Sequence, residues 1–174
     1  MKNRRYGNLL VVLLALVLVL AVPLGARAAT TADVSVTATP TYIAISVNPT
    51  SYDYATVAAS TDEQTTTTYF TITNTSSVQT DQTISVTTTT WAGGVTWAHS
   101  ETATGGADTA GLNANKGGTW GVGDVIVKNG TPNFIAENQA ATANYDFGLE
   151  LVAPTSFTDG VEKSITVRVS AAAG

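Results

Sequence analysis

The chain of 174 residues contains no cysteine and only one histidine, His99. The absence of cysteine excludes disulfides, thiol nucleophiles and thiolate metal sites. A catalytic triad or a zinc centre needs several groups acting together, and no Gly-x-Ser-x-Gly motif accompanies the single imidazole. We therefore expect no catalytic, cofactor-binding or metal-binding residue, predict that the protein is not an enzyme, and place His99 at the surface or at a strand end.

Basic residues are also scarce, and half of them lie near the N-terminus. A basic start at residues 1–6 precedes an unbroken apolar run of 14 residues, 9–22, and the triplet Ala26-Arg27-Ala28 follows. These three parts are typical of a secretory signal peptide, whereas a membrane-spanning helix needs roughly 20 apolar residues. We predict a helical signal peptide at residues 1–28, with an uncleaved N-terminal anchor as the alternative.

The mature chain that remains, residues 29–174, is strongly acidic. It holds 13 acids against four strong bases, so its formal charge is −9, compared with −5 for the whole sequence. Binding to nucleic acid or to anionic lipid needs clustered Lys and Arg. The composition therefore argues against a nucleic-acid partner and against a membrane partner after cleavage. The expected location is secreted or extracytoplasmic, and association with the cell surface stays open.

Helical periodicity is missing from the mature chain, and strand-like alternation takes its place. Threonine, which is β-branched and suits a pleated strand, fills 14 of the 30 positions from 61 to 90. Apolar and polar residues alternate at 34–38, 43–47, 70–73, 84–87, 145–151 and 165–170, as in strands with one buried face. We predict an all-β chain with one domain, an antiparallel β-sandwich at residues 29–174. A barrel is the alternative.

Glycines and tryptophans mark the candidate binding residues. The glycine-rich stretch at about 105–123 predicts a long excursion between two strands, anchored by Leu112 and Trp120, and long loops are often functional. Trp91 and Trp97 flank a Gly-Gly pair, which predicts a hairpin. Exposed aromatic rings stack on sugars, whereas buried ones supply core area. Trp91, Trp97 and Trp120 are therefore the candidate ligand contacts.

Two motifs in the first half of the mature chain resemble a known family. Residues 48–54 read NPTSYDY and lead to Val57, and residues 69–76 read YFTITNTS. They resemble the opening strands of bacterial immunoglobulin-like domains of the ASH and choice-of-anchor type, in which Phe-Gly stands where this chain has Tyr54-Ala55. The resemblance implies an immunoglobulin-like sandwich in an extracytoplasmic setting, and it implies no reaction.

Two classes of function fit these observations. The first is a non-enzymatic structural protein of an envelope, surface layer, filament or matrix, whose partners are other envelope components or further copies of itself. Residues 33–39 are a strand candidate at the free end, which pairs either within its own domain or with a neighbour's open edge. The second is a small carbohydrate-binding module that holds a polysaccharide through exposed tryptophans.

The first prediction concerns processing. Because small residues at 26 and 28 follow the apolar run, we expect the exported protein to begin at Ala29, within one or two residues. N-terminal sequencing of the exported material checks this. An intact Met1 would show that the segment is an anchor.

Overall fold

The computed structural model describes residues 33–174, so the predicted signal peptide lies outside the described residues. The chain divides between Thr39 and Pro40. Before this point, residues 33–39 belong to no strand, and Val34 and Val36 are 83% and 87% exposed. The strand expected here therefore does not form with any of the described residues. After this point the chain is built from strands, and no helix occurs in the described residues.

Eleven strands make up residues 40–174. They are β1 (Ile45–Asn48), β2 (Glu63–Gln64), β3 (Phe70–Asn74), β4 (Thr80–Val86), β5 (Thr90–Trp91), β6 (Trp97–Ser100), β7 (Thr109–Asn115), β8 (Val125–Ile126), β9 (Asn133–Gln139), β10 (Asn144–Val152) and β11 (Val167–Ala173). The prediction of an all-β chain is confirmed. Over residues 33–174, no helix is long and apolar enough to cross a membrane.

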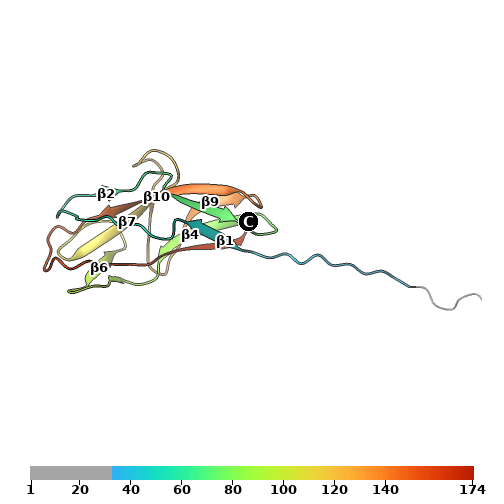
Figure 1. Ribbon diagram of the computed structural model, residues 1–174, viewed down its shortest axis with the longest axis horizontal. Helices are drawn as coiled ribbons and strands as arrows, with labels where there is room; N and C mark the ends of the chain where they lie inside the picture. The colour runs from blue at the N-terminus through green and yellow to red at the C-terminus, as the bar shows by residue number, and fades with distance from the viewer. Residues whose placement is uncertain (1–32) are drawn as a thin grey trace, which may run out of the picture. The chain divides into compact units, whose positions relative to one another are not determined.

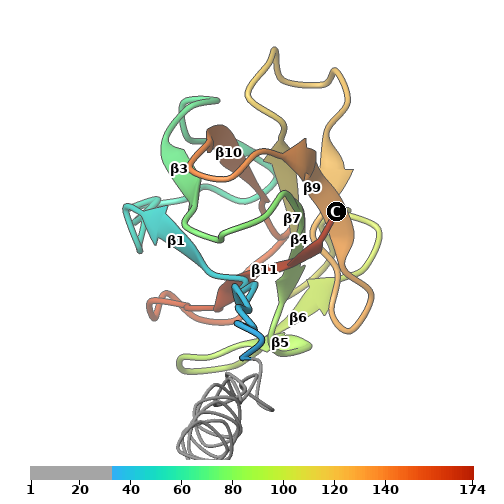
Figure 2. The same cartoon turned by 90° about the vertical axis from the view of Figure 1, so that its right-hand side faces the viewer.

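The strands form two curled sheets in a sandwich-like arrangement (Figures 1 and 2). The larger sheet has the order β1-β3-β10-β7-β6-β5, with β2 paired to β10 and β8 paired to β7. The smaller sheet has the order β11-β4-β9. Strand pairs are antiparallel except for β6 and β7, which run parallel. Consequently β1 ends one sheet and β11 ends the other.

Apolar residues at every second position of the strands point to the same face and form the core, as expected from strand geometry. Phe147 of β10 is the register partner of Phe70 in β3, and their rings stack with centroids 5.1 Å apart. From the other sheet, Ile84 and Val86 of β4 join the same apolar cluster, at 0% and 2% exposure. Residues from both sheets therefore share one apolar interior.

Five of the alternating windows became strands, namely β1, β3, β4, β10 and β11. The expected excursion at 105–123 is wrong in its middle, because β7 passes through it and pairs with β10 and β6. Ala110, Leu112 and Ala114 of β7 are at most 2% exposed. Gly111 lies so close to the backbone of the loop at Ala103 that a Cβ at Gly111 would come 2.6 Å from Cα of Ala103. Glycine in this stretch therefore permits close packing of a core strand.

His99 also differs from its expected place at the surface or a strand end. It lies within β6, is 7% exposed, and its Nε2 is 2.7 Å from the carbonyl oxygen of Val127. This single contact ties β6 to the chain that follows β8. The imidazole is thus a buried polar link in the fold.

The second prediction tests the core register. Phe147→Ala removes a ring that is 2% exposed and stacked on Phe70, so it should lower the free energy of unfolding by about 3–5 kcal/mol. The neighbouring Asp146 is exposed and accepts a hydrogen bond from Thr71, and Asp146→Ala should cost less than about 1 kcal/mol. Urea unfolding of both variants checks this. The opposite ranking would show that the register is wrong.

Candidate functional site

An open groove with an apolar floor and mixed walls runs along one side of the sandwich, and we call it the β1–β11 groove. One wall is formed by residues 47–57 and the other by residues 157–169. The floor is made of core side chains: Phe70, Trp91, Trp97, Leu112, Phe147, Leu149 and Leu151. The groove encloses about 1010 Å³, which is at the upper end of the range for small-molecule pockets.

The groove exists because both sheets end at this place. β1 pairs only with β3, and β11 pairs only with β4, so within residues 33–174 no strand covers the second edge of either one. The two strands approach each other at the groove (Figure 2). Val47, Val167 and Val169 are only partly buried, in contrast to Ile84 in the interior. The valines of the two edge strands are therefore incompletely covered on this side, while the floor residues beneath them are at most 8% exposed.

Two of the three candidate tryptophans lie in the groove floor. Trp91 and Trp97 are direct register partners in the β5–β6 hairpin, which confirms the predicted pairing. They are 6% and 8% exposed, and their Nε1 atoms have no hydrogen-bond partner among the described residues. Trp97 stacks on Phe157 with centroids 5.3 Å apart. Neither ring presents an open face on which a sugar can stack.

Trp120 lies apart from the other two. It is partly exposed and does not line the groove. It packs over β10, where a Cβ at Gly148 would come 2.9 Å from its Cζ2. The expected anchoring of the glycine-rich stretch by Trp120 is therefore observed, and the three tryptophans do not form one surface.

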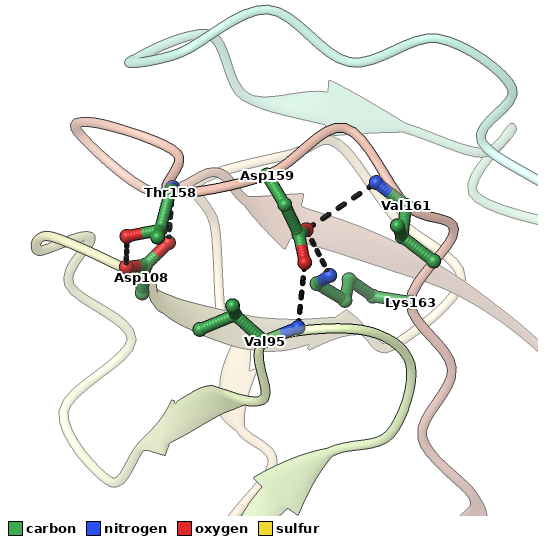
Figure 3. Close-up of polar contacts among 6 residues, drawn as sticks. All are labelled: Val95, Asp108, Thr158, Asp159, Val161 and Lys163. Carbon is green, nitrogen blue, oxygen red and sulfur yellow. Dashed lines mark hydrogen bonds and ion pairs between the residues drawn. The ribbon is translucent and has the colours of Figure 1, made fainter.

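Two carboxylates hold the 157–169 wall in place (Figure 3). Asp159 accepts hydrogen bonds from the backbone N–H groups of Val95 at 2.5 Å and Val161 at 3.3 Å, and it forms an ion pair with Lys163. Asp108, just before β7, accepts hydrogen bonds from the backbone N–H of Thr158 at 2.8 Å and from its hydroxyl. These contacts fasten the wall to the β5–β6 turn and to the loop before β7.

The ion pair is sheltered on the lysine side. The Lys163 side chain is 3% exposed, and its Nζ lies 5.7 Å from the centroid of Trp97. The hydrogen bond from Lys163, followed by that from the Val95 N–H, lowers the pKa of Asp159 below its ordinary value. Asp159 therefore stays ionised at neutral pH, and its role is to hold the wall.

The Gly93-Gly94 pair in the turn of the β5–β6 hairpin lies directly against the 157–169 wall. A Cβ at Gly93, whose φ is +123°, would come 2.0 Å from the carbonyl oxygen of Glu162, and a Cβ at Gly94 would come 2.3 Å from Oδ2 of Asp159. At Gly93 the clash is with backbone and the φ value favours glycine, so no other residue fits there, whereas at Gly94 a side chain would displace the Asp159 carboxylate. Glycine at position 93 therefore allows the hairpin to meet the wall.

Aromatic rings support the opposite wall. Tyr52 makes edge contacts with Tyr54 at 4.8 Å and Tyr69 at 4.7 Å, and Tyr69 continues the series to Phe70 at 4.9 Å between centroids. Burial raises the pKa of Tyr54, and the neighbouring Tyr52 and Glu150 raise it further. Its phenol is therefore neutral, and the aromatic rings form a series of edge contacts that reaches from the surface to the core.

The groove combines an apolar floor with walls that carry the charged side chains of Asp53, Asp159, Glu162 and Lys163. In the part of the chain that the structure describes, no group of three or more His, Cys, Asp or Glu side chains is placed to hold a metal ion. No family model, curated protein or solved structure matches the chain. The groove must therefore be interpreted from its own residues.

Sequence reasoning missed the contacts of Asp159, Lys163 and Asp108. Asp159-Gly160 was recognisable as a turn, and the Gly-Gly pair between two tryptophans as a hairpin, but nothing local shows that these turns touch. The alternation at 43–47 and 165–170 predicted the flanking strands. Their position at the sheet ends depends on strand order, which the pattern does not contain.

The third prediction concerns acid. Because the pKa of Asp159 is lowered in the folded protein, its stabilising effect is present above the unfolded value of about 3.9 and is lost as the pH falls through the folded value. Asp159→Asn should lower the urea midpoint at pH 7 and flatten its decline in acid. The exposed Asp62→Asn is the control. Acid dependence in Asp159→Asn equal to that of the wild type would contradict this role.

Proposed function

We propose that the protein is a non-enzymatic, exported structural subunit of an envelope, surface-layer, filament or matrix assembly, built on an immunoglobulin-like sandwich. One observation carries the proposal. The domain has an open groove between β1 and β11, where neither strand has a second partner among the described residues, while residues 33–39 of the same chain have strand alternation and pair with no described strand. Neither the open groove nor the unpaired segment adds to the stability of an isolated monomer.

The physical argument starts from the free edges. An uncovered strand edge presents N–H and C=O groups that pair readily with another chain. Half-buried valines beside such an edge gain further burial when a strand is added, at about 25 cal/mol per Å² of apolar surface. The formal charge of −9 on the mature chain keeps non-specific association low, so that association is confined to these edges.

The exported and immunoglobulin-like parts of the proposal rest on sequence features. They are the signal-peptide pattern at residues 1–28 and the motifs at 48–54 and 69–76. The sandwich-like arrangement of two sheets is compatible with both. Because the chain has no cysteine, the stability of the domain depends on side-chain packing and on backbone hydrogen bonds and not on disulfides.

A carbohydrate-binding module is the second candidate, and partly exposed aromatic rings favour it. Trp120 is partly exposed, and Tyr52 and Tyr69 are 38% and 36% exposed. The burial of Trp91 and Trp97 removes the two rings that would have formed a platform on the hairpin. The second candidate therefore depends mainly on Trp120.

The fourth prediction tests the structural role. The purified mature protein should show a mass that rises with concentration in light scattering, and regular polymers or sheets in negative-stain microscopy. The reason is that edge pairing between copies is a mass-action process. A protein that stays monomeric over the whole accessible concentration range would rule out the proposed function.

The carbohydrate alternative has its own test. Tryptophan fluorescence should shift with at least one polysaccharide of a broad panel, and Trp120→Ala should abolish the shift. Trp91→Phe, at a buried position, is the matched control and should retain it. No shift with any polysaccharide would remove this alternative.

A further inference from the structure

We propose that residues 33–39 of a second copy occupy the β1–β11 groove as an added strand, so that copies join end to end. This inference rests on the proposed function, because it names the segment and the surface through which the subunits assemble. The argument concerns the segment, the groove and the path of the chain between them.

The segment has the properties of an unpaired strand. Its residues read DVSVTAT, with Val34, Val36 and Ala38 on one face and small polar residues on the other. Both valines are more than four-fifths exposed. Asp33, at the outer end, is its only charged residue, so residues 34–39 can enter the groove without burying a charge of their own. After cleavage at Ala28 only four residues precede it, so a free end enters the groove.

The groove has the properties of a strand site. Its walls end in β1 and β11, whose outer edges have no partner in the described residues. Its floor is apolar, and Val167 and Val169 of β11 remain partly exposed beside it. β11 contains seven residues, as does the segment, which spans about 23 Å when extended at roughly 3.3 Å per residue; Val167 and Val169 are the residues of β11 that line the groove. An extended peptide therefore matches the free edge of β11 in length, and its apolar face matches the apolar floor of the groove.

The path of the chain favours a groove in another copy. The backbone N–H of Ser77 donates to the carbonyl oxygen of Tyr42 at 3.2 Å, and that of Thr75 donates to the carbonyl oxygen of Ala44 at 3.0 Å. These bonds continue the β1–β3 pairing toward the N-terminus, away from the wall that begins at Val47. The chain therefore enters β1 from the end opposite this wall, and Val34 and Val36 remain 83% and 87% exposed, so the segment is available to a groove in another copy.

Single cysteines in this cysteine-free chain provide the test. One batch of the mature protein carries Val36→Cys, and a second carries Val167→Cys, on the groove side of β11. The matched control for the second batch is Arg168→Cys, at the adjacent exposed position. After mixing, assembly and mild oxidation, the Val36–Val167 pair should give several-fold more disulfide-linked heterodimer than the Val36–Arg168 pair. Equal yields would overturn the proposal.

A double variant with both Val36→Cys and Val167→Cys separates the two possible routes. At high dilution it should remain uncrosslinked within the chain. An efficient intramolecular disulfide would show that the segment fills its own groove, and would overturn the proposal that it joins copies.

Charge substitutions separate this inference from the proposed function. Val36→Asp should abolish assembly, and Thr37→Asp, on the opposite face of the segment, should leave most of it intact; equal urea midpoints would show that both variants fold. If the wild type and Val36→Asp assemble equally well, the docked strand is wrong while the structural role stands. If the wild type never assembles, the proposed function itself is wrong.

Discussion

The structure depends on covering an apolar interior without the help of disulfides. Two curled sheets bury Ile84, Leu112 and Phe147 almost completely, and most sides of this interior are closed by neighbouring strands. Between β1 and β11 the sheets end without a covering strand from residues 33–174. Full burial of a valine side chain is worth about 1.5–3 kcal/mol, so the half-covered valines of both edge strands leave stabilising energy that a further strand can supply.

The groove remains open because its walls are held from outside. Asp159 and Asp108 fasten one wall to the hairpin turn and to the loop before β7, and the rings of Tyr52, Tyr54 and Tyr69 support the other. The close contact at Gly93 fixes the hairpin against the wall. A docking strand would therefore meet a preformed site, and the site itself would lose little conformational entropy on binding.

Local patterns predicted those parts of the fold that depend on local order. Alternation identified β1, β3, β4, β10 and β11, and the Gly-Gly pair identified the Trp91–Trp97 hairpin. β7 was missed because its inward residues Ala110, Leu112 and Ala114 include two small ones and are flanked by glycine and asparagine. The groove was not predictable, because it follows from strand order and from contacts between distant turns.

Backbone hydrogen exchange of β11 tests most directly whether the sandwich lacks a strand. In the dilute protein, the alternate amides of β11 that point away from β4 should exchange rapidly, while those bonded to β4 stay protected. On assembly the outward amides should become protected while the inward ones change little. Outward amides that are protected already in the dilute protein, or that gain no protection on assembly, would contradict the account.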